Sequence, residues 1–184
     1  GPMKAGPSVA DLVAGLYAAN AIQAALYYRD ANGGEGQYID ISLLDTTVAL
    51  VAQFAAHYFM SGEIPARVGV RANGGTPGGG YKCADGDILI APGSQLLYEK
   101  FCDAIGCPEL KSNPRFVTNL ERVRNRKELT DIIEPIIEAL PVAEMHAKMV
   151  TAGIPSSPVN DMAQVFEDEQ IRERGLAQQV VHPV

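Results

Sequence analysis

The chain has 184 residues, 47% of them apolar, and a net charge of −7 at neutral pH. The negative charge argues against a nucleic-acid partner, because phosphate binding requires a basic surface. No apolar run reaches the roughly 18–20 residues that span a bilayer, and no secretory signal pattern is found, so we expect a cytoplasmic protein without a membrane partner.

Two apolar helices and one strand are predicted in the first third of the chain. Residues 11–29 carry apolar side chains at helical spacing, and the glycines after Asn32 end this helix. Residues 37–42 alternate polar and apolar side chains, which is typical of a strand. Residues 43–62 form a second apolar helix that ends at a glycine. This order indicates part of an α/β layered domain, whose remaining layer comes from a missing part of the chain or from another subunit.

The rest of the chain is predicted to contain a compact small α/β unit at residues 81–158. A glycine-rich loop at 63–80 leads into a β-hairpin at 81–91, with Asp85 and Gly86 in its turn. Helices are predicted at 94–106, 119–140 and 141–153, one or two short helices at 160–175, and a last strand at 177–184. We expect Pro135 to bend or divide the second of these helices.

The cysteines and histidines are too scattered to predict a metal centre. Their spacing matches neither the known zinc patterns nor a disulfide framework. We therefore expect reduced thiols, no metal ion and no tightly bound cofactor. The six positions are Cys83, Cys102, Cys107, His57, His146 and His182.

Asp11 opens the first helix and has two alternative interpretations. An acidic residue at a helix start is favoured by capping and by the helix dipole, and either Ser8 or Asp11 could cap this helix. A carboxylate at this position could equally attack an activated acyl group and form a covalent intermediate. The local sequence alone does not decide between these two roles.

The loop before the hairpin is unusually rich in glycine, since five of the seven residues from 74 to 80 are glycine. This run matches neither the dinucleotide-binding pattern nor a Walker A loop. A flexible linker, a mobile lid and a set of backbone amides that stabilise an oxyanion all remain open. The glycines concerned are Gly74, Gly75, Gly78, Gly79 and Gly80.

Two groups of basic residues are found in this half of the chain. Arg67 and Arg71 flank the glycine run and could hold a phosphate or a carboxylate. The basic residues between 122 and 127 lie between Glu121 and Glu128, so we expect them on a solvated helix face.

Four stretches of the chain together resemble the family III CoA-transferases, the CaiB/BaiF family. This family includes formyl-CoA transferase, carnitine CoA-transferases and α-methylacyl-CoA racemase. The order and spacing of the stretches match as well, and the resemblance covers essentially the whole chain. The stretches are SVADLVAGLYAANAIQAAL, GEGQYIDISLLDTTVAL, GGGYKCADGDILIA and AGIPSSPVNDMAQVFEDEQIRERG.

The resemblance implies a covalent transfer reaction with Asp11 as the nucleophile. In such enzymes the aspartate attacks an acyl-CoA thioester and forms an acyl anhydride and CoA thiolate. The acceptor, a carboxylic acid, then exchanges through an aspartyl-CoA thioester, with CoA as a substrate. The resemblance also implies that the glycine residues 78–80 form a lid that keeps water from the reactive intermediate.

The resemblance further implies an α/β fold made of part of a Rossmann-like large domain and a small α/β domain. Residues 1–62 match the last part of the large domain and 63–80 a linker. Residues 81–158 match the small domain, and 159–184 return towards the large one. Family members are about twice as long and form interlocked homodimers, so we expect this chain to be inactive on its own.

Two other functions remain open from the sequence. An α-methylacyl-CoA racemase would exchange the α-proton of its substrate through an acid/base pair. The histidine of that pair lies in a region that precedes the matching stretches, so the sequence does not test it. In a non-catalytic assembly module, Asp11 would only cap its helix.

Overall fold

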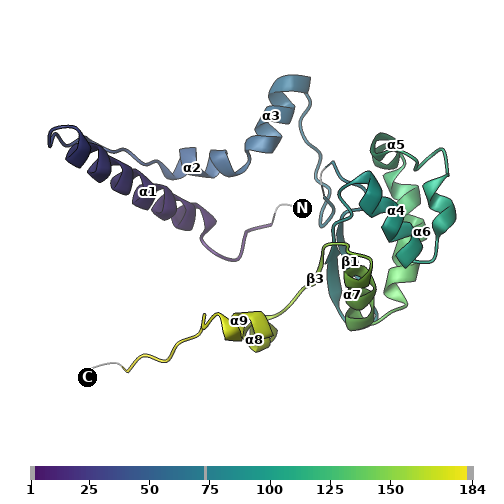
Figure 1. Ribbon diagram of the computed structural model, residues 1–184. Coiled ribbons are helices and arrows are strands. Elements are labelled where there is room, and N and C mark those ends of the chain that lie inside the picture. The colour runs from purple at the N-terminus through teal and green to yellow at the C-terminus, as the bar shows by residue number, and fades with distance from the viewer. Residues whose placement is uncertain (1–2, 73, 182–184) are drawn as a thin grey trace. The chain divides into compact units, whose positions relative to one another are not determined.

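The structure is a computed structural model that describes residues 3–72 and 74–181. The chain divides into two compact units, residues 1–67 and 68–184, which are described separately (Figure 1). The division falls inside the segment that the sequence predicts as a linker. His182 lies outside the described residues, as does the end of the predicted last strand.

The first unit contains three helices. Ser42 caps the second one, because its Oγ accepts a hydrogen bond from the backbone N–H of Asp45 at 3.3 Å. The third helix ends at Gly62, whose left-handed φ of 72° is readily adopted by glycine. The predicted helix at 43–62 is therefore two helices, joined at Val51 with a bend of 72°. The elements are α1 (Val9–Ala31), α2 (Leu43–Leu50) and α3 (Ala52–Ser61).

The strand predicted at 37–42 is not formed. These residues are extended but pair with no neighbouring strand among the described residues. A strand needs a partner for its backbone N–H and C=O groups, and the first unit offers none. Residues 37–41 instead run along α1 and line a cavity of about 610 Å³ together with Ala21, Ala25 and Tyr28.

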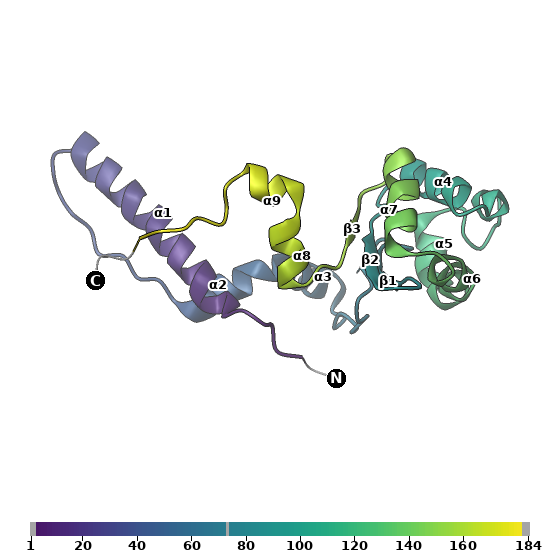
Figure 2. The same ribbon diagram turned by 90° about the horizontal axis from the view of Figure 1, so that it is seen from below.

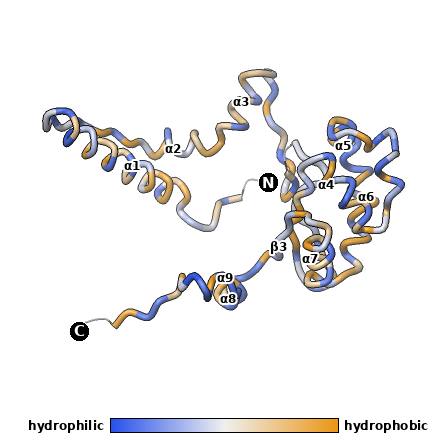
Figure 3. The backbone as a smooth tube through the Cα atoms, viewed as in Figure 1, coloured by the Kyte–Doolittle hydropathy of each residue, from blue (hydrophilic) through white to orange (hydrophobic). Residues whose placement is uncertain are grey.

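Many residues of α1–α3 are apolar, as the orange colour along these helices in Figure 3 shows. Most of their apolar side chains are exposed. Helix α1 packs on α2, yet Leu16 is 65% and Phe59 82% exposed. By length and composition alone α1 could cross a membrane, and α2 with α3 could count as a second, bent span. The expectation that no apolar run is long enough therefore fails for α1. The same composition is typical of a core helix that neighbouring layers cover.

The second unit is built on a three-stranded antiparallel sheet with strand order β1-β2-β3. The predicted hairpin is confirmed, and its first strand begins two residues earlier than expected. Leu89 pairs with Gly80 on one side and with Ser157 on the other. The strands are β1 (Gly79–Lys82), β2 (Asp87–Ile90) and β3 (Ser156–Pro158).

Helices of the second unit cover one face of this sheet (Figure 2). Ser94 caps the first of them as predicted, accepting a hydrogen bond from Leu97 N–H at 3.2 Å. The helix predicted at 119–140 divides at Asn125, whose side-chain amide bonds the carbonyl oxygens of Arg115 and Glu121. Pro135 instead lies inside the following helix. The elements are α4 (Gln95–Ala104), η1 (Pro108–Lys111), α5 (Asn119–Arg124), α6 (Arg126–Glu138) and α7 (Val142–Thr151).

Two short helices follow the sheet, α8 (Met162–Glu167) and α9 (Glu169–Glu173). A capping box starts α8, because Asp161 and Gln164 bond each other's backbone N–H groups. The last predicted strand is not formed over the part that the structure describes, residues 177–181. No partner strand lies beside these residues in the described sheet.

The core of the second unit lies between the sheet and α4, α6 and α7. Every second residue of β2 faces this core, and each covering helix supplies fully buried side chains. The largest contributors are Ile88, Ile90, Tyr98, Phe101, Phe116, Leu129, Ile133, Ile137, Met145 and Met149. Residues 68–184 thus bury a continuous core of their own.

Replacing a core residue tests this description. Ile133 is fully buried, so Ile133→Ala should lower the free energy of unfolding by about 2–5 kcal/mol, through lost burial and the cavity left behind. The matched control is Leu120→Ala on α5, which is 59% exposed and should change the value by less than about 0.5 kcal/mol. Urea unfolding of the two variants measures both effects, and equal losses would contradict the assigned core.

Candidate functional site

Asp11 lies in the first turn of α1 and is exposed to solvent. Ser8 occupies the N-cap position without a side-chain cap bond. Among the described residues, the Asp11 carboxylate makes no hydrogen bond or ion pair. The helix N-terminus still favours a negative charge at this position through its dipole. Asp11 is therefore an accessible carboxylate that caps no backbone group among the described residues.

The three candidate glycines lie at the start of the sheet. Gly79 and Gly80 belong to β1 and pair with Ile90 and Leu89, so the prediction of a loop is wrong for these two positions. Gly79 has a φ of 143°, and a Cβ there would lie 2.7 Å from the Cα of Arg71. Glycine is required because the chain at Arg71 passes close against β1. Gly78 remains in the loop that precedes the strand.

Arg71 joins this loop to the sheet and to α6. Its Nη1 donates to the carbonyl oxygen of Gly80 at 2.6 Å, and its Nη2 forms an ion pair with Glu134. Its guanidinium also stacks over the ring of Tyr81, 4.0 Å from the ring centre. These contacts give Arg71 a structural role in β1. The binding of a phosphate or carboxylate by Arg71 stays a prediction. Such a ligand would have to compete with Glu134 for the guanidinium of Arg71.

A groove of about 430 Å³ opens beside this arginine on the second unit. Its lining includes the apolar side chains of Val70, Leu89 and Val159, together with charged side chains. Both signs of charge are present, so the groove does not select an anion. The charged residues are Arg71, Lys82, Asp87, Glu134 and Glu138.

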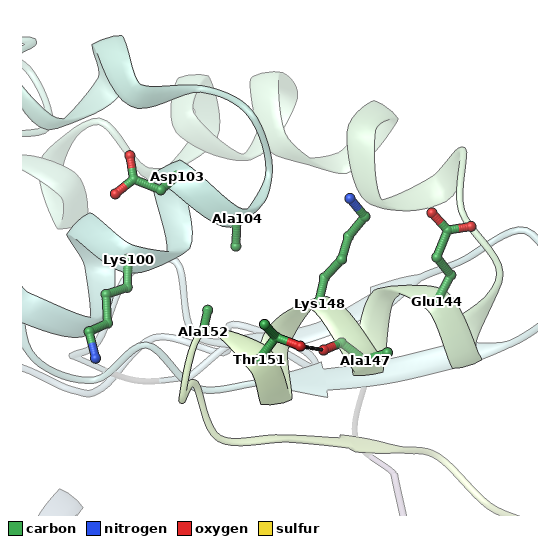
Figure 4. A pocket seen from close by; sticks show the side chains of 8 residues that line it. All are labelled: Lys100, Asp103, Ala104, Glu144, Ala147, Lys148, Thr151 and Ala152. Carbon is green, nitrogen blue, oxygen red and sulfur yellow. Dashed lines mark hydrogen bonds between the residues drawn. The ribbon is translucent and has the colours of Figure 1, made fainter.

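A second groove, of about 770 Å³, lies between α4 and α7 (Figure 4). Alanines line its floor, and its rim carries Lys100 and Asp103 from α4 with Glu144 and Lys148 from α7. Figure 4 shows these side chains spread along the groove rather than directed at one point. Ligand sites need convergent polar groups, so this groove is not assigned a ligand.

The structure contains polar contacts that the sequence analysis missed. Arg122 and Arg126, expected on a solvated helix face, contact the glycine-rich loop instead. Arg122 is only 2% exposed, and its Nε donates to the carbonyl oxygen of Thr76 at 2.8 Å. No local signal marks this position, because α5 ends at Arg124 and the buried Leu129 belongs to the next helix.

The cysteines carry no sign of a metal or of nucleophilic chemistry. Cys83 and Cys102 are buried, and burial raises the pKa of the Cys102 thiol to about 11. A thiol of this kind stays protonated at neutral pH. Among the residues that the structure describes, no group of three or more His, Cys, Asp or Glu side chains could hold a metal ion.

Comparison with known proteins identifies the family. The model of CoA-transferase family III matches residues 1–184. The chain therefore belongs to CoA-transferase family III, which confirms the predicted resemblance.

The relatives share both sequence and fold with this chain. A succinate–glutarate CoA-transferase of Agrobacterium fabrum is 34% identical over 95% of the chain, and the human succinyl-CoA:glutarate CoA-transferase 32% over 99%. A CaiB/BaiF family protein from Brucella suis, 36% identical, superposes with a TM-score of 0.75 over 95% of the chain. The chain spans 44%, 41% and 46% of these proteins, respectively, so it is less than half their length. The structural likeness confirms the predicted fold.

The close approach at Gly79 predicts the effect of a substitution. Gly79→Ala should lower the free energy of unfolding by about 1–3 kcal/mol, because its Cβ would meet backbone atoms of residues 70 and 71. Gly75→Ala is the control, since a Cβ at Gly75 meets no atom within 4 Å. Urea unfolding distinguishes them, and a harmless Gly79→Ala would show that the two segments do not approach so closely.

The buried Tyr81 predicts a loss of stability in alkali. Burial raises the pKa of Tyr81 to about 12, against the partly offsetting effect of the Arg71 charge. The neutral phenol is favoured in the folded state, so its contribution is complete below pH 10 and is lost as the pH rises to 12. Tyr81→Phe should flatten this part of a plot of melting temperature against pH. An unchanged slope would assign the alkaline loss to other groups.

Proposed function

We propose that this chain is part of an enzyme that moves CoA from an acyl-CoA thioester to a carboxylic acid, with Asp11 as the nucleophile. The observation that carries the proposal is the placement of Asp11. This carboxylate is exposed in the first turn of α1, without a capping role, in a chain that matches CoA-transferase family III throughout. Attack by a carboxylate turns one difficult acyl transfer into several easier steps.

The first half of the reaction releases the donor acid. An oxygen of Asp11 attacks the thioester carbonyl, the C–S bond breaks and CoA leaves as a thiolate, which produces an aspartyl anhydride. The thiolate then attacks the aspartyl carbonyl of this anhydride. The donor acid leaves as a carboxylate, and an aspartyl-CoA thioester remains.

The second half repeats these steps in reverse with the acceptor. The acceptor carboxylate attacks the aspartyl thioester, which gives a new anhydride and CoA thiolate. The thiolate attacks the acyl carbonyl of the acceptor, and the product acyl-CoA leaves with Asp11 restored as a carboxylate. No net proton transfer is needed, so Asp11 requires no general base.

The two anhydrides have to be kept from water. We propose that the glycine residues 78–80, at the junction of loop and β1, supply this protection in the whole protein. Gly79 and Gly80 are paired in the sheet, so the loop part of such a cover is the segment before them. The backbone at these positions carries no side chain, which lets a substrate approach closely.

The whole enzyme is proposed to be a homodimer of a longer chain. The relatives are more than twice as long, and α1–α3 expose large apolar side chains such as Tyr27 and Phe59. A surface of this kind calls for a covering layer. The isolated chain is therefore expected to be inactive. Short dicarboxylic acids are the proposed substrates, because the relatives are named for succinate and glutarate.

Replacement of Asp11 in the whole protein tests the nucleophile. With succinyl-CoA and glutarate, Asp11→Ala should lower the rate of glutaryl-CoA formation by roughly 10⁴-fold or more. Its stability should change by about 1 kcal/mol at most, because no cap bond is lost. Asp45→Ala, at the first turn of α2, is the matched control and should retain transfer.

The intermediate provides a second readout of the same proposal. Hydroxylamine added during turnover should convert the activated carboxyl of Asp11 to a hydroxamate, which mass spectrometry of the peptide detects. Retained transfer in Asp11→Ala, or a hydroxamate on another residue, would overturn the assignment. The reaction is best run in heavy water, since deuterium at the α-carbon of a branched acyl-CoA without transfer would indicate a racemase.

A further inference from the structure

The loop at residues 74–78, which leads into β1, is held by side chains from outside the loop. Asn119, at the first position of α5, makes two of these contacts. Its Nδ2 donates to the carbonyl oxygen of Gly74 at 2.7 Å, and its Oδ1 accepts from Thr76 N–H at 3.3 Å. One exposed amide thus binds the loop backbone at two points.

Arg122 holds the same loop from the buried side. Its Nε donates to Thr76 O at 2.8 Å, while Nη1 donates to Phe116 O at 2.9 Å and to Gln95 Oε1 at 3.0 Å. The guanidinium also stacks over the ring of Tyr98, with 3.9 Å to its centre. Three separate segments of the second unit are therefore joined through one side chain.

The chemistry of Arg122 is unusual for a residue that only stabilises a core. The polar groups that it contacts, two carbonyls and a side-chain amide, are all uncharged. Burial of a cation without a carboxylate costs free energy, and an apolar side chain often serves stability as well. Charge-assisted hydrogen bonds do fix the positions of their acceptors. This favours a role for Arg122 in placing the loop.

The remaining carbonyl oxygens of the loop are also bound. Arg126 donates to Ala72 O at 2.9 Å, and the hydroxyl of Tyr81 donates to Pro77 O. Within the segment itself, Gly78 N–H bonds Gly75 O and Ala72 N–H bonds Gly78 O. Every carbonyl of the described residues 72 and 74–78 therefore has a partner, although half of these residues are glycine. Glycine has the greatest backbone freedom to lose, and these bonds remove it.

We propose that Asn119, Arg122 and Arg126 are positioning residues of CoA transfer, which hold Ala72 and the 74–78 loop so that the backbone at 78–80 excludes water from the anhydride. This inference rests on the proposed function. The three side chains act through the loop and touch no reacting atom. Their contribution is to keep the cover in one conformation while the intermediate exists.

Loosening the loop should therefore change the fate of the intermediate. Water that reaches the aspartyl anhydride attacks its acyl carbonyl, the C–O bond to Asp11 breaks, and the products are the free acid and a restored Asp11 carboxylate. Because CoA has already left as a thiolate, the net result is thioester hydrolysis. The ratio of hydrolysis to transfer therefore reports the position of the loop. A change in the overall stability of the fold would not by itself alter this ratio.

The experiment compares two variants in the whole protein with succinyl-CoA and glutarate. Asn119→Ala removes both loop contacts from an exposed position, so folding should be retained. We expect the ratio of hydrolysis to transfer to rise at least about fivefold, the factor expected for the loss of one ordinary hydrogen bond. Arg124→Gln is the control on the same helix. Its side chain is 63% exposed and pairs only with Glu121 among the described residues, so the ratio should not change.

Amide hydrogen exchange of peptides covering residues 72–80 gives an independent readout. Exchange should accelerate in Asn119→Ala and stay unchanged in Arg124→Gln. Faster exchange with an unaltered hydrolysis ratio would overturn the positioning role, because the loop would then be loosened without consequence. Unchanged exchange would show that the hydrogen bonds of Asn119 do not hold the loop.

The result also separates this inference from the proposed function. If the unaltered protein forms neither glutaryl-CoA nor a hydroxamate at Asp11, the proposed function fails and the catalytic part of the inference fails with it. If the unaltered protein transfers CoA but Asn119→Ala behaves as Arg124→Gln does, only the inference fails. Arg122→Lys, which keeps the charge but loses the planar fork, should resemble Asn119→Ala.

Discussion

The second unit depends on one buried cation. The guanidinium of Arg122 links the glycine-rich loop at Thr76, the end of the connection at Phe116 and the start of α4 at Gln95, while it stacks on Tyr98. A planar group with five donors suits this task, because a single point charge reaches fewer carbonyl oxygens. Tyr98 and Phe116 belong to the hydrophobic core, so Arg122 joins the loop to two residues of that core.

Much of the second unit could be predicted from local signals. The Asp85-Gly86 turn predicted the hairpin, and Ser94 predicted the start of α4. These predictions held because a turn or cap depends on a few neighbouring residues. The strand at 37–42 failed for the opposite reason, since pairing requires a distant partner that no local pattern provides.

The same distinction between local and distant signals applies to the candidate site. Asp11 was predicted from its place at a helix start, together with the family resemblance. The structure shows it exposed and without a cap bond, and its role as the nucleophile stays a prediction. The contacts of Arg122 with Thr76 join residues 46 positions apart, so composition alone assigned this arginine to solvent. A charged residue in a helical pattern is usually exposed, and only the tertiary contact overrides that preference.

The contrast between the two units has a consequence for the isolated chain in solution. Residues 68–184 close a core of their own, whereas the side chains of α1–α3 remain largely in contact with water. Exposed apolar surfaces promote aggregation. Contacts between copies of the isolated chain are therefore expected to form through α1–α3 rather than through the second unit.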